Sequence, residues 1–174
     1  DGFQSIAGET PVTNLTIDGN VFTEWTGRQD HPLRCSLQGI GLFDGFFDNL
    51  VITNNVVSVT AYHGIGVLGA RGAKIVNNTV VHALGHTKLE PWIGVYNHKN
   101  GTPSTDVLVA NNLAMRYMGS SDLVNRIEFR SNSVVGTPGA VFEGPSTFDS
   151  RPRVDSGLVD TADKPAAPPV DRII

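Results

Sequence analysis

The sequence predicts an all-β protein, a single-stranded right-handed parallel β-helix (a solenoid) of about five coils. Three observations lead to this prediction. The chain contains an internal repeat with alternating apolar residues, every repeat carries an asparagine at the same place, and no stretch of helical length shows a 3.6-residue apolar period. In a solenoid each coil contacts only its neighbours, so one continuous core is expected along the axis.

The repeat is carried by five segments that superpose without gaps from their third residue or earlier. Two apolar columns lie two positions apart, as alternate residues of a strand must, and we expect both to point inward. The first contains Leu15, Leu50, Ala73, Val107 and Ile127, and the second contains Ile17, Ile52, Ile75, Val109 and Phe129. The mixed column between them suits an outer face, with Thr16, Val51, Lys74, Leu108 and Glu128.

An asparagine column marks a bend between two short strands of each coil. It consists of Asn20, Asn55, Asn78, Asn112 and Asn132. Asparagine suits such a bend because it tolerates left-handed backbone and because its amide bonds to nearby backbone groups. The apolar column resumes after the bend at Phe22, Val57, Val80, Ala114 and Val134. The asparagines are therefore predicted to be structural.

A second motif precedes the first in most repeats and supplies another strand. It reads Gly2-Phe3-Gln4-Ser5, Gly39-Ile40-Gly41-Leu42, Gly64-Ile65-Gly66-Val67 and Trp92-Ile93-Gly94-Val95. Strands of one coil can pair only with those of the next coil, in parallel, and parallel crossovers are right-handed in nearly all proteins. This rule is the basis for the predicted hand.

Residues 1–149 are predicted to form the β-helix and residues 150–174 an irregular tail, cap or linker. The repeats stop beyond Gly144, and the tail is rich in Pro, Asp and Ala. The first residues already belong to a repeat, and an exposed terminal coil would present unpaired strand edges. We therefore expect upstream coils to be missing, or another chain or cap to cover this end.

Composition excludes several classes of protein. The chain has 174 residues, 40% of them hydrophobic and only 17% charged, which excludes disorder for most of it. A net charge of −4 gives no basic footprint, so no nucleic-acid partner is expected. No apolar run is long enough to insert into a membrane, and the single cysteine, Cys35, excludes an internal disulfide. The two functions considered below imply a secreted, extracellular or virion-surface location.

The N-L-x-I-x-x-N-x-V/F repeats with their intervening G-I-x-V strands resemble the right-handed β-helix repeats of the pectate-lyase-like superfamily. The resemblance covers roughly residues 1–142. Members of that superfamily include polysaccharide lyases, polygalacturonases, mannuronan epimerases and phage tail-spikes. The resemblance implies the fold and a polysaccharide partner, whereas the activity must be argued from a site.

The Gly-Ile-Gly strands predict a ligand platform. With Phe3, Ile40, Ile65 and Ile93 inward, a flat outer strip is expected along Gln4, Gly41, Gly66 and Gly94. An apolar rail of Ile6, Phe43, Leu68 and Tyr96 lies on one side, and Asp1, Gln38, His63 and Pro91 lie on the other. Aromatic rails stack against sugar rings. The alternative is that the glycines serve tight coil geometry and that a loop, the tail or a neighbouring subunit covers the row.

His63 is the candidate acid/base, because only histidine has an unperturbed pKa near neutrality. Loops 26–37 and 82–91 leave the coil after the same column, and Arg34 or Lys88 could bind a uronate carboxylate there. His31 and His82 belong to the same loops. The remaining substrate-binding candidates are Gln38, Phe43, Asp44, Tyr96, His98, His86 and Glu90. A structural histidine and a solvated loop edge are the alternatives.

The sequence lacks the residues that glycoside hydrolysis and calcium binding would need on the outer face. Glycoside hydrolysis needs a carboxylate pair across the bond, and no such cluster is expected on the outer face. Calcium needs several carboxylates, whereas only Asp1, Asp44 and Asp48 are nearby. No metal site and no cofactor are therefore expected, with calcium as a weaker alternative.

Two functions remain. The first is a carbohydrate-interacting module, a lyase or epimerase relative that acts on an acidic glycan. The second is a non-catalytic tail-spike, fibre or other structural segment that self-assembles, as a trimer in the tail-spike case, through the exposed rows of Val51 with Leu108 and of Phe43 with Tyr96.

Overall fold

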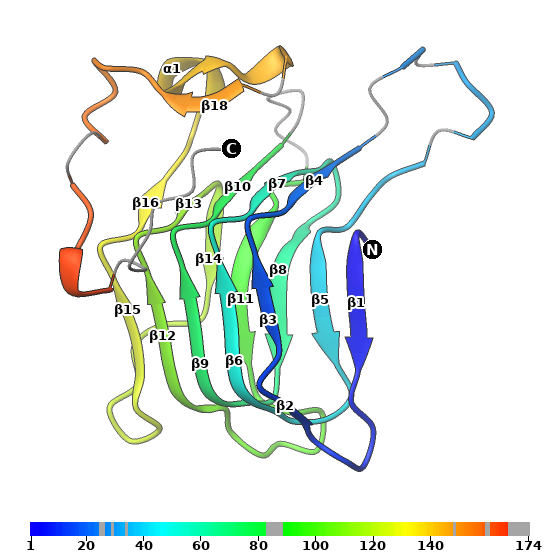
Figure 1. Cartoon of the computed structure of the whole chain (residues 1–174), viewed down its shortest axis with the longest axis vertical. Helices are drawn as coiled ribbons and strands as arrows, with labels where there is room; N and C mark the ends of the chain where they lie inside the picture. The colour runs from blue at the N-terminus through cyan, green and yellow to red at the C-terminus, as the bar shows by residue number, and fades with distance from the viewer. Residues whose placement is uncertain are drawn as a thin grey trace.

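The computed structural model describes residues 1–24, 27–28, 30–33, 35–82, 89–147, 149–158 and 161–166. It is an all-β structure whose strands lie mainly in three parallel sheets, consistent with a parallel β-solenoid. Successive coils lie side by side, and β15, β12, β9, β6 and β3 follow one another across the view in Figure 1. Each coil contributes to all three sheets in turn.

We call the sheets A, B and C. Sheet A contains β1 (Phe3–Ile6), β5 (Ile40–Phe43), β8 (His63–Leu68), β11 (Trp92–Tyr96) and β14 (Arg116–Met118). Sheet B contains β2 (Val12–Thr13), β3 (Thr16–Asp18), β6 (Phe47–Thr53), β9 (Ala70–Val76), β12 (Thr105–Ala110) and β15 (Ile127–Arg130). Sheet C contains β4 (Val21–Thr23), β7 (Val56–Ser58), β10 (Thr79–Val81), β13 (Leu113–Ala114) and β16 (Ser133–Val134).

The strand register confirms the predicted columns. Ile17 pairs with Ile52, Ile52 with Ile75, Ile75 with Val109, and Val109 with Phe129. The three central members of this column are completely buried. The mixed column from Thr16 to Glu128 is in register on the outer face, as expected. The alternation of apolar and mixed positions thus decides which face of sheet B meets the core.

One member of the apolar column after the bend departs from the prediction. Val134 is in register with Ala114, but its side chain is 68% exposed. The next residue, Val135, is buried instead, in a second small cluster with Met115 and Phe142. In this last coil the buried valine is therefore Val135. It packs against Phe142, from beyond the repeats, and not against the main core.

The asparagine ladder is present and continuous. The backbone N–H and the Nδ2 of Asn55 both donate to Oδ1 of Asn78, at 3.1 and 2.9 Å. Asn78 donates in the same way to Asn112, at 2.9 and 3.0 Å. The pattern also joins Asn20 to Asn55 and Asn112 to Asn132. The side chains are buried at the centre of the ladder, and each amide is fully used.

The ladder asparagines themselves do not adopt the left-handed backbone that was predicted for them. The left-handed backbone lies one residue earlier, at Gly19, Asn54, Asn77, Asn111 and Ser131. A second left-handed column, which the sequence did not reveal, crosses sheet B at Asn14, Asn49, Gly72, Asp106 and Arg126. The ladder asparagines are thus selected for their hydrogen bonds, and their neighbours supply the turn.

Beyond the repeats the chain forms α1 (Pro138–Val141), β17 (Phe142–Gly144), η1 (Pro145–Thr147), β18 (Asp149–Pro152) and η2 (Lys164–Ala166). β17 and β18 form an antiparallel hairpin, drawn above the coils in Figure 1. The predicted domain boundary after residue 149 falls within β18, and that division stays a prediction. Among the described residues, no helix has the length and apolar character needed to cross a bilayer.

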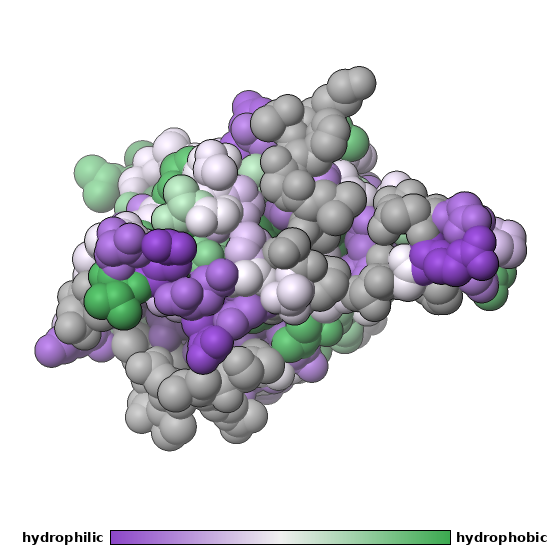
Figure 2. All heavy atoms as spheres, turned by 90° about the horizontal axis from the view of Figure 1, so that it is seen from above, coloured by the Kyte–Doolittle hydropathy of each residue, from purple (hydrophilic) through white to green (hydrophobic). Residues whose placement is uncertain are grey.

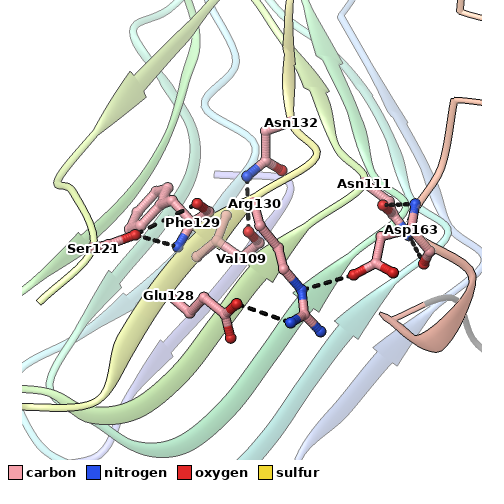
Figure 3. Close-up of polar contacts among 8 residues, drawn as sticks. All are labelled: Val109, Asn111, Ser121, Glu128, Phe129, Arg130, Asn132 and Asp163. Carbon is pink, nitrogen blue, oxygen red and sulfur yellow. Dashed lines mark hydrogen bonds and ion pairs between the residues drawn. The ribbon is translucent and has the colours of Figure 1, made fainter. Parts of the chain in front are cut away.

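The tail is fastened to the coils at Asp163 (Figure 3). Its backbone N–H donates to Oδ1 of Asn111 at 2.7 Å, and its carbonyl accepts from Nδ2 of the same side chain at 2.9 Å. Its carboxylate lies 2.8 Å from Nε of Arg130, whose guanidinium also contacts Glu128. The tail therefore lies against the corner between sheets B and C.

Replacing Asn78 with alanine should lower the free energy of unfolding by about 3 kcal/mol or more, because the change leaves several buried partners unsatisfied at ~1–3 kcal/mol each. Asn20→Ala, in the same column but exposed at the end of the ladder, is the matched control and should cost about half as much or less. Urea denaturation measures both. Equal losses would contradict the structural role of the buried ladder.

Candidate functional site

The outer face of sheet A carries the predicted glycine row. Gln4, Gly41, Gly66 and Gly94 are in register across four strands. The row is not a bare strip, however, because aromatic rings lie over it. A Cβ at Gly41 would lie 2.4 Å from the Phe43 ring, and one at Gly94 would lie 2.7 Å from the Tyr96 ring. Glycine is required here because the rings occupy the space of a side chain.

Five rings gather on this face, and we call them the aromatic cluster: Phe43, Tyr62, His63, Trp92 and Tyr96. Trp92 is at the centre, with ring centroids 4.6 Å from His63 and 5.5 Å from Tyr96, both edge to face. His63 lies 4.4 Å from Tyr62 and 5.7 Å from Phe43. Tyr62 is 45% exposed, whereas Trp92 is only 8% exposed. The cluster therefore has a buried centre and an accessible tyrosine at its margin.

The residue beside His63 on the next strand is Trp92, and not Pro91 as the sequence predicted. The strand register shifts between Trp92 and Ile93, so that Trp92 pairs with His63 and Ile93 with Ile65. Gly64 is the extra residue of this bulge. A Cβ at Gly64 would lie 2.8 Å from the carbonyl oxygen of Trp92. The repeat hinted at this irregularity, since Trp92 stands where the other coils have glycine, but only the pairing shows that His63 lies beside Trp92.

His63 is half-buried and sits among three of these rings. Burial lowers the pKa of its imidazole from the ordinary value of 6.5. Its Nδ1 atom is shielded from solvent and has no hydrogen-bond partner among the described residues. Burial therefore favours the uncharged form of the ring at neutral pH. Proton exchange with a bound ligand would go through the other nitrogen, Nε2.

Arg116 borders the cluster, and sequence reasoning missed it. It is the exposed first residue of β14, in register with Trp92. Burial raises the pKa of the Tyr96 hydroxyl, and the positive charge of Arg116 opposes that rise. Within the described part of the chain, Arg116 forms no ion pair. The signal in the sequence was weak, because Arg116-Tyr117-Met118 lacks the Gly-Ile-Gly pattern of the other strands.

A buried carboxylate, also missed by the sequence, holds the segment that leads to Tyr62 and His63. Glu24 is 7% exposed, and its Oε1 accepts the backbone N–H of Leu37 at 2.7 Å and that of Thr60 at 3.0 Å. The Thr60 hydroxyl donates to the same oxygen. Glu24 thus ties the end of loop 26–37 to the turn of the next coil, three residues before His63.

Other predicted residues lie at the far end of the sheet A strands. Asp44 pairs with Lys99 at 2.9 Å. His98 stacks on Phe46 with centroids 4.8 Å apart, and the Arg71 guanidinium lies 4.4 Å from the same ring. These contacts fasten the loop after β11 to the corner between sheets A and B. None of these contacts involves His63.

The remaining candidates lie in or beside the two loops. Gln38 is half-buried directly before β5, and Glu90 is exposed shortly before β11. His82 is buried, and its backbone N–H donates to Sδ of Met115, so it is not part of an exposed loop edge. Arg34, His86 and Lys88 lie outside the described residues, and their predicted roles stay predictions. The described part of loop 26–37 projects away from the coils, and its tip is largely hydrophilic (Figure 2).

No metal centre is formed by the described residues, in which no three His, Cys, Asp or Glu side chains are grouped to hold an ion. Two of the carboxylates considered for calcium are already paired, Asp44 with Lys99 and Asp48 with Arg71. Among the described residues, the groups at this face that can take part in chemistry are the imidazole of His63, the aromatic rings, the tyrosine hydroxyls and Arg116.

Comparison with known proteins identifies no relative. No protein-family model, no curated protein and no solved structure matches the chain.

The lowered pKa of His63 predicts how stability depends on pH. The unfolded chain binds this proton more tightly than the folded one, so the free energy of unfolding should fall as the pH drops from 6.5 through the lower folded-state pKa. His63→Gln removes this contribution. The stability of the original protein relative to the variant should therefore rise between about pH 5 and pH 8. A difference that stays constant across this range in urea titrations would contradict the assignment.

Proposed function

We propose that this chain is a carbohydrate-interacting module that receives a polysaccharide on the outer face of sheet A. In this proposal its solenoid is a right-handed parallel β-helix of about five coils, as in the pectate-lyase-like superfamily. The aromatic cluster is the observation that carries the proposal. Aromatic faces bind the C–H faces of sugars, while tyrosine hydroxyls and an exposed amide such as that of Gln4 bond to hydroxyl groups.

The geometry of the coils suits an extended polymer. The cluster draws its rings from three neighbouring coils, at Phe43, Tyr62 with His63, and Trp92 with Tyr96. Coils repeat at about 4.8 Å, the spacing of neighbouring β-strands. That step is close to the length of one sugar in an extended chain. A glycan running along the solenoid axis would therefore meet one set of side chains per sugar.

An acidic glycan and proton-transfer chemistry fit the polar residues of this face. Lyases and epimerases of uronans both begin by removing the proton from the carbon next to the carboxylate. An uncharged imidazole at His63 can accept that proton. A cation must neutralise the carboxylate, and Arg116 stands in register beside Trp92 for that role. Arg34 and Lys88 remain the loop candidates for the same task.

Binding should depend on Tyr62, whose substitution disturbs little of the core because the side chain is 45% exposed. We expect Tyr62→Ala to weaken binding of a uronan oligosaccharide about 3- to 10-fold, the equivalent of one aromatic contact of ~0.5–1.5 kcal/mol. Val154→Ala, at a residue 89% exposed in the tail, is the control. Calorimetric titration against pectate and alginate oligosaccharides measures both. Absence of binding to either glycan would overturn the proposal.

Catalysis is tested separately, by the ultraviolet absorbance of unsaturated products from the same glycans. His63→Ala should abolish product formation while binding persists, because the imidazole is assigned to proton transfer and the rings to binding. Product formed at an unchanged rate by His63→Ala would remove His63 from the mechanism.

The fibre function remains the second candidate, and one observation favours it. Val51 and Leu108 belong to one outer column of sheet B, are half-buried, and line a groove of about 450 Å³ with Lys74 between them. Such a row could pack against another subunit. Light scattering separates the two candidates, since a particle that stays monomeric at high concentration contradicts the fibre.

A further inference from the structure

We propose that the groove between the tail and the corner of sheets B and C is a binding site for a neutral sugar. The groove has a volume of about 530 Å³, a usual size for a small-molecule site in a protein. It shares no residue with the aromatic cluster, so the proposal is independent of the function proposed for sheet A. Three features carry it: two fixed walls, hydroxyl groups on both of them, and a lining without unpaired charge.

Two segments far apart in the sequence form the walls of this groove. One wall is the corner of the coils, from Asn54 after β6 to Ser133 in β16. The other is the tail, from Ser150 in β18 to Ala162. A ligand between them would therefore be contacted from two sides.

The tail wall is anchored at both ends. Before it, Phe142 is buried in the small cluster with Val135 and Met115. After it, the backbone of Asp163 forms two hydrogen bonds with the side chain of Asn111 (Figure 3). Both walls are thus held in place before a ligand binds, and such preorganisation favours binding.

Hydroxyl groups of both walls line the groove. On the coil wall Thr79 and Ser133 are half-buried and Ser131 is exposed, and on the tail wall Ser150 is half-buried. None of these four side chains has a hydrogen-bond partner among the described residues. A hydroxyl group can donate and accept, and it rotates to suit its partner. The lining therefore suits a ligand whose own polar groups are hydroxyls.

Apolar side chains alternate with the hydroxyls along the coil wall. Val56, Thr79, Leu113 and Ser133 are in register on neighbouring strands, in that order. Leu158 adds apolar surface on the tail wall. A sugar carries hydroxyls around the edge of its ring and apolar C–H groups on its faces. It therefore matches a lining in which a few polar groups stand among apolar ones.

The described lining carries no unpaired charge. It contains no aspartate, glutamate or lysine, and its one arginine, Arg151, is paired with Asp149 at 2.6 Å. An ionised ligand would lose hydration here without gaining an unpaired opposite charge. The ligand that fits is therefore neutral, in contrast to the acidic glycan proposed for sheet A.

An extended peptide fits this groove less well. The tail shows how a peptide binds at this corner, since the amide of Asn111 takes both backbone groups of Asp163. The amide of Asn54, in the same column, donates to Oδ1 of Asp18 at 2.9 Å. Because these amides are already bonded, a second peptide would not find a continuous row of them.

The test is a nuclear magnetic resonance titration with galactose and glucose, each compared with its uronate, galacturonate or glucuronate. The members of each pair differ only in whether the carbon outside the ring is an alcohol or a carboxylate. We expect at least one neutral sugar to shift the backbone amide resonances of Thr79, Leu113 and Ser133 to saturation, with a dissociation constant of about 1–10 mM. Its uronate should bind about 3-fold more weakly or worse.

Variants locate the binding. Thr79→Val removes one hydroxyl and should weaken binding about 3- to 10-fold, and valine fits there because Val56 is its counterpart on the neighbouring strand. Thr16→Val, on the outer face of sheet B and outside the groove, is the matched control and should leave binding unchanged. Asn111→Gly keeps the left-handed backbone but releases the tail, and should weaken binding by about 3-fold or more.

Three outcomes would overturn the proposal. The first is that neither neutral sugar shifts these amides. The second is a uronate that binds here as tightly as its neutral counterpart, since Arg151 would then be available to an anion. The third is unchanged affinity in Thr79→Val or Asn111→Gly, with the variant folded by circular dichroism. The reporting amides lie in the groove and not beside Tyr62 or Trp92, so the result does not depend on whether sheet A binds a glycan.

Discussion

The hydrogen bonds of the asparagine ladder are the constraint on which the rest of this structure depends. Asn55, Asn78 and Asn112 are buried amides, and burying such a group is costly unless every donor and acceptor has a partner. Here each Nδ2 also reaches a carbonyl of the preceding coil, as Asn78 does with Ile52 at 2.9 Å. These bonds can all form in only one relative position of two coils. The ladder therefore sets the register that the apolar columns fill.

Once the register is set, the outer face of sheet A follows from it. Gly41, Gly66 and Gly94 form one row because their strands pair in register. Since glycine has no side chain, the aromatic rings can lie directly over this row. Trp92 lies two residues before Gly94 and therefore faces the same side, and the bulge at Gly64 brings His63 into register beside it. A shift of one residue in any coil would send these rings toward the core.

Arg116 differs from most of the described basic residues, which are paired with carboxylates. Most described basic residues lie beside a carboxylate, as in Arg71 with Asp48 and Lys99 with Asp44, and exposed pairs of this kind contribute little to stability. Arg116 has no such partner in the described structure and stands beside aromatic rings. The buried carboxylate of Glu24 works locally, because it fixes the turn that carries Tyr62 and His63.

The sequence by itself determined the all-β class, the inward columns, the asparagine ladder and the glycine row, because residues that stack directly over one another repeat in the sequence at recognisable positions. His63, Phe43 and Tyr96 could be placed on one face for the same reason. The pairing of Trp92 with His63 and the positions of Arg116 and Glu24 could not, since a bulge, a strand without the motif and a contact between a bend and the next coil leave no periodic signal. Those three depend on the pairing of particular coils, and only the tertiary structure decides that pairing.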